Sequence, residues 1–212
     1  MSIRDERKQQ SRQALLDAAL KLSTSGRAFS TISLREIARE VGLVPTAFYR
    51  HFDDMEKLGE ALVEQVAERL RQIISHLRQG YLNHQDAKTR TSLELFFRAV
   101  DQNQPDWLFL IAERWGGSVM VRTEINKKIE ILIEDLAKDF DENDNFRAIK
   151  NPADLPIISS IIINLSFTWA MTWLNLNTQY SGMELVKQQQ LYIDQVSTQV
   201  QLLFRGIANW EK

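Results

Sequence analysis

The sequence predicts an all-α protein in which a small N-terminal unit of three helices precedes a larger helical region. Apolar residues recur at steps of three and four along most of the chain, which is the period of a helix with one buried face. Capping residues, glycines and prolines mark where these segments begin and end. The chain has 212 residues, 44% hydrophobic and 25% charged, which is the composition of an ordinary globular protein. It is therefore long enough for one large domain or two small ones.

The most informative segment is residues 33–52, SLREIAREVGLVPTAFYRHF. Ser33 and Glu36 have the spacing of a capping box, which satisfies backbone N–H groups at a helix start. Gly42 can adopt the left-handed conformation that ends a helix, and Pro45 is tolerated in the first turn of a second helix. Two short helices joined in this way form a helix-turn-helix, whose second helix enters the major groove of DNA.

Side chains of this motif divide into an expected core and an expected DNA-facing set. Phe48 and Phe52 are expected to hold the two helices together. His51 can donate to a phosphate, although packing is an equally good interpretation of a histidine followed by phenylalanine. The residues expected to contact DNA are Ser33, Arg35, Thr46, Ala47, Tyr49, Arg50, His51 and Lys57.

Charge is distributed unevenly along the chain. Residues 1–52 contain nine Lys or Arg and five Asp or Glu, whereas the other 160 residues contain 17 and 23. A local basic excess suits a module that contacts phosphates, and its affinity for DNA should fall as salt rises. The first 13 residues are expected to form a short polar arm. Its basic side chains either follow the DNA backbone or form a solvated terminus, and they are Arg4, Arg7, Lys8 and Arg12.

Helical periodicity continues on both sides of the motif. A first helix with Leu15 and Ala19 on its apolar face is expected to end near Gly26. A long helix is expected from Asp53 or Asp54 to Leu77, long enough to join two domains. The further expectations are a loop over 80–86, helices over 87–100, 105–115 and 121–140, an acidic turn over 141–145, and a last helix with an apolar stripe from Ile193 to Trp210.

Residues 155–183 contain no Asp, Glu, Lys or Arg. The length is sufficient for a membrane span, but Pro156, several polar residues and acidic flanks count against one. The remaining interpretation is a helix buried on all sides, which in so short a chain requires a partner subunit. Together with the last helix, it predicts a homodimer with a four-helix interface and a palindromic operator, with half-sites about 34–36 Å apart.

Aromatic and aliphatic residues crowd the two segments around residues 93–100 and 107–115. The pattern alone favours a plain hydrophobic core. The wall of an apolar ligand pocket is the alternative, since such pockets are largely apolar with few polar groups.

Composition also excludes classes of function. The chain has no cysteine and only three scattered histidines, so neither a thiolate site nor a catalytic metal site is expected. No glycine-rich phosphate loop, G-x-S-x-G or H-E-x-x-H occurs. We therefore expect no enzymatic activity, no cofactor and no metal. The start of the chain lacks the apolar stretch of a secretory signal, so a cytoplasmic location is expected.

The elements S-L-R-E-I-A, V-G-L and P-T-A-F-Y-R-H-F within residues 33–52 resemble the DNA-binding domain of the TetR family of bacterial transcriptional regulators. Within that family the chain is most similar to FabR and DesT, repressors of unsaturated fatty acid synthesis. It differs at Met55, where the family commonly has a lysine, and Lys57 is the candidate to replace that phosphate contact. It also has Trp115 where these repressors have a small polar residue after Glu-Arg.

The resemblance implies a DNA-binding domain over residues 1–54 and a ligand-binding and dimerisation domain over 55–212. The pocket residues that it implies are Phe96, Phe97, Leu108, Phe109, Ala112, Glu113, Arg114, Trp115, Ile129 and Trp169. The implied effector is a long-chain acyl thioester, on coenzyme A or on acyl carrier protein. Two alternatives are a repressor of efflux or catabolic genes that senses an aromatic compound, and a helical lipid carrier without DNA function.

Overall fold

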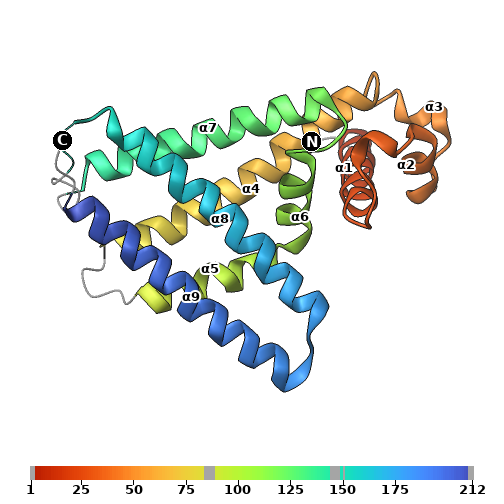
Figure 1. The fold of residues 1–212 in the computed structure, drawn as a ribbon. Helices are drawn as coiled ribbons and strands as arrows, with labels where there is room; N and C mark the ends of the chain where they lie inside the picture. The colour runs from red at the N-terminus through yellow and green to blue at the C-terminus, as the bar shows by residue number, and fades with distance from the viewer. Residues whose placement is uncertain (1–2, 84–88, 144–148, 150, 210–212) are drawn as a thin grey trace. The chain divides into compact units, whose positions relative to one another are not determined.

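The computed structural model describes residues 3–83, 89–143, 149 and 151–209, and all regular structure within them is helical (Figure 1). The predicted all-α fold is therefore confirmed. In chain order the helices are α1 (Ile3–Ser23), the 3₁₀ helix η1 (Phe29–Thr31), α2 (Leu34–Glu40), α3 (Pro45–Phe48), α4 (Met55–Asn83), α5 (Thr89–Gln102), α6 (Gln104–Glu113), α7 (Val119–Asp141), α8 (Asp154–Gln179) and α9 (Gly182–Ala208).

The chain divides into two compact units. The first consists of Met1–Leu70 with Leu108–Lys128, and the second of Arg71–Trp107 with Ile129–Lys212. The divisions fall inside α4, α6 and α7, so each of these helices contributes residues to both units. The boundary after residue 54 expected for a DNA-binding domain remains a prediction.

In the first unit, the residues predicted to start and end helices do so. Ser33 and Glu36 form the complete capping box at the start of α2, and Pro45 occupies the first turn of α3. Between these helices Gly42 has φ of +69°, a conformation that costs a residue without Cβ little. Phe48 and Phe52 are buried, which confirms that they belong to the core.

Several helix boundaries differ from the expectations. The helix α1 already begins at Ile3, so the prediction of a polar arm is wrong for residues 3–13. The helix α4 continues to Asn83, which replaces the first half of the loop expected over 80–86, whereas residues 84–86 lie outside the described residues. The acidic turn over 141–145 lies partly outside them, and Trp210 entirely.

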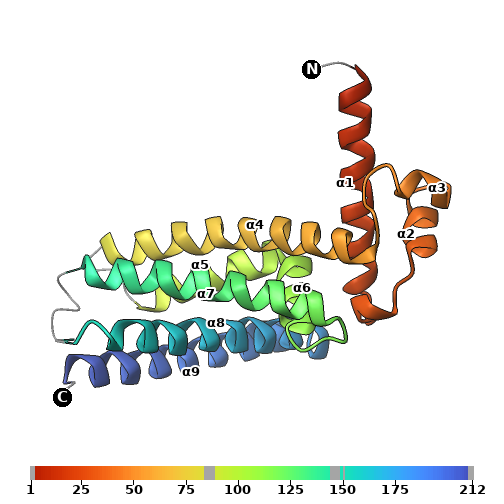
Figure 2. The ribbon, with the colours of Figure 1, turned by 90° about the horizontal axis from the view of Figure 1, so that it is seen from above.

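In the second unit, α8 and α9 run antiparallel side by side, and α5 packs against both (Figure 2). Aromatic rings fill the space between these helices. The ring of Trp173 from α8 stacks on Phe97 from α5, with centroids 4.3 Å apart, and Trp107 meets Phe96 and Phe167 edge to face. These contacts place the aromatic cluster of the sequence largely in a packed core.

The helix α8 is long and apolar enough to cross a membrane by length and composition, and 44% of its most apolar 18-residue window is buried inside the structure. A core helix of a soluble protein passes the same test. Within the single chain α8 is not buried on all sides, because Ile157 is 58% exposed and Ile161 is 44% exposed. Complete burial of α8 would therefore need a second subunit.

Replacement of Gly59 by alanine should destabilise the first unit. A Cβ built at Gly59 lies 2.9 Å from Met120 Cε, 3.0 Å from Val121 Cγ2 and 3.1 Å from Phe29 Cε1. Overpacking of this kind costs about 1–3 kcal/mol, which outweighs the roughly 0.5–1 kcal/mol that alanine contributes inside a helix. Urea denaturation should show a net loss of about 1 kcal/mol.

Gly206→Ala is the matched control, because a Cβ at this α9 position has no neighbour within 4 Å. This variant should be about 0.5–1 kcal/mol more stable than the unmodified protein. Equal stabilisation by the two substitutions would contradict the close packing around Gly59.

Candidate nucleic-acid interface and ligand cavity

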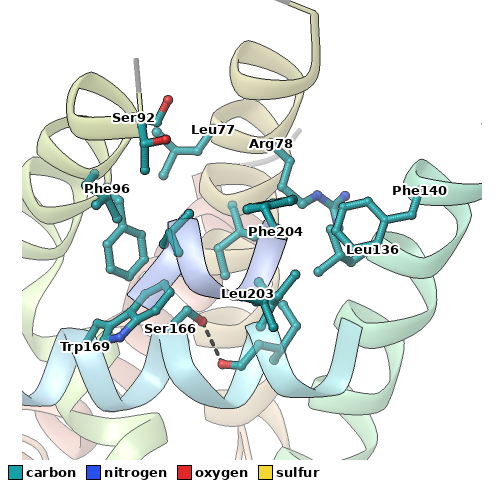
Figure 3. A pocket seen from close by; sticks show the side chains of 16 residues that line it. Leu77, Arg78, Ser92, Phe96, Leu136, Phe140, Ser166, Trp169, Leu203 and Phe204 are labelled. Atoms are coloured by element: carbon teal, nitrogen blue, oxygen red, sulfur yellow. Dashed lines mark hydrogen bonds between the residues drawn. The ribbon is translucent and has the colours of Figure 1, made fainter. Parts of the chain in front are cut away.

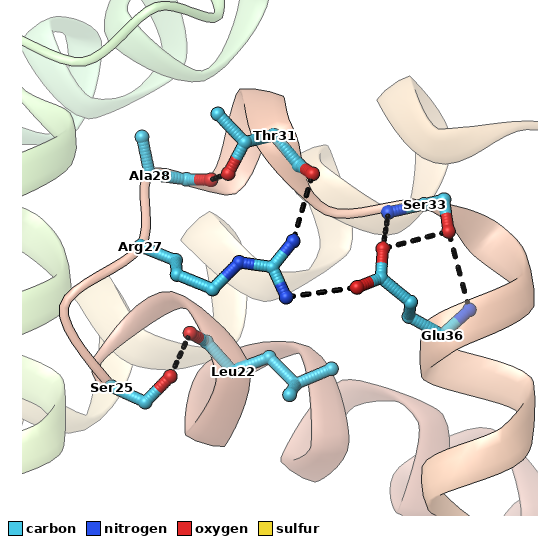
Figure 4. A network of polar contacts seen from close by, with 7 residues as sticks. All are labelled: Leu22, Ser25, Arg27, Ala28, Thr31, Ser33 and Glu36. Atoms are coloured by element: carbon cyan, nitrogen blue, oxygen red, sulfur yellow. Dashed lines mark hydrogen bonds and ion pairs between the residues drawn. The ribbon is translucent and has the colours of Figure 1, made fainter.

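A polar network fixes the start of α2 within the first unit (Figure 4). The Ser33 N–H donates to Glu36 Oε2 at 2.9 Å, while Arg27 donates to Glu36 Oε1 at 2.8 Å and to the Thr31 carbonyl at 3.0 Å. The Arg27 hydrogen bond, followed by those from Ser33, lowers the pKa of Glu36 to about 2. Arg27 therefore ties η1 to α2, which orients the helix-turn-helix.

The helix α3 directs its apolar side inward and a polar surface outward. Phe48 is fully buried and packs against Phe52 and edge to face against Tyr49. Tyr49 is 60% exposed, Thr46 and Arg50 are exposed, and Ala47 is half-buried. These four of the residues expected to contact DNA thus lie on or near the surface of the short helix and the turn that follows it.

His51 lies beside a polar groove of about 610 Å³ that Arg12, Phe52 and Lys57 also line. The Arg12 guanidinium lies over the Phe52 ring, 4.9 Å from its centroid. Burial lowers the pKa of His51 below its usual value, and the positive charges of Lys8, Arg12 and Arg50 lower it further. Three basic side chains thus act on the imidazole, whereas Asp53, Glu60, Glu64 and Glu124 also line the groove. The neutral imidazole retains one N–H donor.

The remaining residues expected at DNA have other contacts. Lys57 Nζ forms an exposed ion pair with Glu60, at 2.8 and 3.0 Å from its two carboxylate oxygens. The Ser33 hydroxyl donates to Glu36 Oε2 at 2.8 Å, and Arg35 is exposed. All three residues are exposed at the surface of the first unit. Their roles at DNA remain predictions.

Glu113 at the end of α6 is a buried residue of the first unit, with only 1% of its surface exposed. Its Oε1 accepts a hydrogen bond of 2.7 Å from the Phe29 N–H, at the start of η1. Desolvation raises the pKa of the Glu113 carboxyl above its usual value. A Cβ at position 116 would lie 2.2 Å from Glu113 Oε2, so any other residue there would displace the Glu113 carboxylate.

The second unit encloses an apolar cavity of about 180 Å³ between α4, α5, α7, α8 and α9 (Figure 3). Figure 3 shows Phe96 and Trp169 toward one end of the cavity and Arg78, Leu136 and Phe140 toward the other. The described lining consists of Ile74, Leu77, Arg78, Thr89, Ser92, Leu93, Phe96, Leu136, Phe140, Ile162, Ile163, Ser166, Trp169, Val200, Leu203 and Phe204. An aliphatic or aromatic ligand suits such a lining.

Two family models match the chain. A family model described as "Bacterial regulatory proteins, tetR family" matches residues 15–62. A second, described as "Tetracyclin repressor-like, C-terminal domain", matches residues 85–200, which is more than half of the chain. The chain belongs to the TetR family. TetR-family proteins are DNA-binding transcriptional regulators and not enzymes, so the helix-turn-helix has the function that the sequence indicated.

Several solved structures share this fold over most of their length. A TetR-family regulator from Syntrophomonas wolfei str. Goettingen matches with a TM-score of 0.67 at 19% identity, over 97% of this chain and 98% of that one. Salmonella enterica GusR matches with 0.66 at 16% identity, over 92% and 95%. FadR from Bacillus subtilis in complex with stearoyl-CoA matches with 0.62 at 14% identity, over 94% and 99%. Identities this low show the fold alone.

The ten residues that the TetR resemblance implied for the pocket lie in different places. Phe96 and Trp169 line the cavity, whereas Phe97 and Ile129 are buried elsewhere in the second unit. Leu108, Phe109, Ala112, Glu113, Arg114 and Trp115 belong to the first unit. Trp115 is 81% exposed, with Arg114 over its ring at 5.5 Å. Their roles toward a ligand remain predictions.

Sequence reasoning missed most of the cavity lining. Leu136, Phe140, Val200, Leu203 and Phe204 lie on two helices that the sequence interpretation assigned to ordinary packing or dimerisation. Their only signal is the period of an apolar helix face, which core residues share. Glu113 had a clearer signal, because the charged pair Glu113-Arg114 lies between Ala112 and Trp115 in an otherwise apolar segment, and a buried carboxylate needs a hydrogen-bond donor.

Glu113→Gln should alter how stability depends on pH. Because folding raises the pKa of Glu113, the folded protein loses stability as pH rises from the unfolded value through the folded one. The loss is about 1.4 kcal/mol for every tenfold difference in acid dissociation constant between the two states. A glutamine still offers an oxygen to the Phe29 N–H but does not ionise. The variant should therefore gain stability relative to the unmodified protein as pH rises above about 4.5, the usual pKa of a glutamate side chain.

Urea denaturation between pH 4 and pH 8 measures this difference. Glu113→Ala is the comparison variant, because it leaves the Phe29 N–H without its acceptor and should lose about 1–3 kcal/mol. A difference between Glu113→Gln and the unmodified protein that stays constant over this pH range would show that ionisation of Glu113 does not affect folding.

Proposed function

We propose that this TetR-family regulator is a cytoplasmic homodimer that represses genes of unsaturated fatty acid biosynthesis and responds to long-chain acyl thioesters. The observation that supports an acyl ligand is the cavity between α4, α5, α7, α8 and α9, whose lining is almost wholly hydrocarbon. The similar fold of Bacillus subtilis FadR, solved with stearoyl-CoA, adds support for a ligand of this class.

The size of the cavity supports a regulatory role for such a ligand. Its volume of about 180 Å³ is smaller than the roughly 300–1,000 Å³ typical of ligand pockets, so a long acyl chain requires a wider arrangement of the surrounding helices. A ligand that binds the wider arrangement more tightly shifts the population toward it. The shift in DNA affinity cannot exceed the difference in ligand affinity between the two arrangements.

Homodimerisation through α8 and α9 has its own support. Ile157 and Ile161 on α8, and Leu191 and Leu202 on α9, are large apolar side chains that the single chain leaves 44–63% exposed. A groove between the two helices is lined by residues that include Leu165, Leu176 and Leu191. Exposed apolar surface on adjacent helices is typical of an interface, and two such pairs related by a two-fold axis form a four-helix bundle.

In this proposal the dimer binds a palindromic operator, because two-fold symmetry places one α3 helix at each half-site. Thr46 and Ala47 contact base edges, Tyr49 and Arg50 lie at the margin of the groove, and His51 and Lys57 face phosphates. Ser33 and Arg35 contact the backbone from the start of α2.

A repressor that senses a planar aromatic compound is the second candidate function. Among the described residues, four aromatic side chains line the cavity, namely Phe96, Phe140, Trp169 and Phe204. Their rings can stack on an aromatic ligand. The third candidate, a lipid carrier without DNA function, has less support, since the TetR family consists of DNA-binding regulators.

Oleoyl-CoA should change the affinity of the purified protein for its operator. The operator is obtained by selection from a pool of random duplexes, and binding is followed by fluorescence anisotropy at two salt concentrations. We expect salt-sensitive, sequence-selective binding whose dissociation constant shifts about 5–150-fold with oleoyl-CoA, the usual range of allosteric coupling. Coenzyme A alone is the control for the headgroup. A response only to a compound such as 2-naphthol would favour the aromatic sensor, and no DNA binding at all would favour the lipid carrier.

Substitutions in α3 should separate contacts to phosphate from contacts to bases. Tyr49→Phe removes a hydroxyl from an exposed ring, so it should weaken binding to the operator and to unrelated duplexes by a similar factor. Thr46→Ala should instead change the preferred base at one position in each half-site, at a cost of about 1–3 kcal/mol. Selection experiments with both variants measure this. If neither substitution has any effect, another element reads the DNA.

A further inference from the structure

Arg78 of α4 is the only residue with an ionisable side chain among the described residues that line the cavity. Its side chain is only 14% exposed, although an arginine normally keeps its charge in water. On one side it pairs with Asp139 of α7, with Nε 3.1 Å from Oδ2. Its Nη1 is buried and, within the described part of the chain, has no hydrogen-bond partner.

A guanidinium has five N–H donors in a planar fork. Its contact with Asp139 is an ion pair by distance, since neither Arg78 Nε nor Asp139 Oδ2 has a hydrogen-bond partner among the described residues. A buried donor without an acceptor is unfavourable, and the apolar lining supplies little compensation. The pair with Asp139 therefore holds the guanidinium in place and leaves part of the fork available at the cavity wall.

A second ion pair joins the same two helices, so the Arg78–Asp139 pair is not needed merely to hold α4 and α7 together. Arg71, two helical turns earlier in α4, pairs with Asp135 at 2.8 Å. The Arg71 side chain is 45% exposed and does not line the cavity. The two helices are thus already joined by a solvated pair, whereas Arg78 lies in an apolar environment.

We propose that Arg78 binds the oxygen-bearing end of an acyl chain whose hydrocarbon part extends across the cavity toward Trp169. This inference rests on the proposed function of the cavity as an effector site. The acceptor is the carboxylate of a free fatty acid or the carbonyl oxygen of an acyl thioester, and a guanidinium binds either one with charge-assisted hydrogen bonds.

The position of Arg78 agrees with such a ligand. Figure 3 shows Arg78 away from the end of the cavity formed by Phe96 and Trp169. An acyl chain whose polar end binds the guanidinium can therefore extend along the apolar cavity. Asp139, which pairs with Arg78, is 28% exposed, so water reaches the outer side of this ion pair.

Isothermal titration calorimetry with hexadecanoate, palmitoyl-CoA and hexadecanol tests the assignment without DNA. The test variant is Arg78→Gln combined with Asp139→Asn, which removes both charges and so leaves no unpaired ion in the core. We expect the dissociation constant for hexadecanoate to rise about tenfold or more, and that for hexadecanol to change less than about threefold. Arg71→Gln combined with Asp135→Asn is the matched control, and should bind all three ligands as the unmodified protein does.

Asp139→Asn alone should change the affinity for hexadecanoate in the opposite direction. It keeps Arg78 but removes the competing carboxylate, so hexadecanoate should bind more tightly than to the unmodified protein. Weaker binding of palmitoyl-CoA to the Arg78 and Asp139 double variant would assign the thioester carbonyl to the same position, and unchanged binding would restrict the site to free carboxylates.

The inference is overturned if the double variant weakens hexadecanoate and hexadecanol equally, if it weakens neither, or if the unmodified protein binds none of the three ligands. The proposed function has a separate test, because it fails when acyl ligands bind the cavity but leave operator affinity unchanged.

Discussion

The buried contact between Glu113 and the Phe29 N–H is the interaction on which the first unit most depends. A carboxylate withdrawn from water is costly unless it is hydrogen-bonded, and here one backbone donor at 2.7 Å is its described partner. The contact joins residues 84 positions apart in the sequence. It fixes the start of η1, and Arg27 then ties the end of η1 to the capping box of α2. The orientation of the helix-turn-helix thus depends on a residue outside it.

Local chemistry explains which parts of the fold were predictable. The capping box of Ser33 and Glu36, the positive φ of Gly42 and the place of Pro45 depend on a few neighbouring residues, and all three were confirmed. The start of α1 was missed because residues 3–13 have hardly any apolar periodicity, so polar helix and polar arm have similar patterns. Aromatic density likewise indicated burial but not which buried residues adjoin a cavity.

The cavity could not be predicted because it arises from packing between five helices that are separated in the sequence. Trp173 and Phe97 stack and fill the space around them, whereas Trp169, only one helical turn before Trp173, faces the cavity. Both tryptophans donate their indole N–H to polar partners, Trp169 to Gln199 and Trp173 to Asp101. Trp169 and Trp173 thus differ only in the residues that surround them, and those residues are distant in the sequence.

The helices α4 and α7 carry residues of both units along one continuous backbone. The helix α4 carries the cavity residues Leu77 and Arg78, and toward its start it carries Gly59, whose Cα region lies against Phe29 and Val121. The helix α7 carries Leu136 and Phe140 at the cavity, and Val121 near its start. The residues around Gly59 and Val121 thus pack against Phe29, whose N–H is the group that Glu113 binds. Because close-packed interiors do not deform continuously, a change of volume at this position affects the segment that orients the helix-turn-helix.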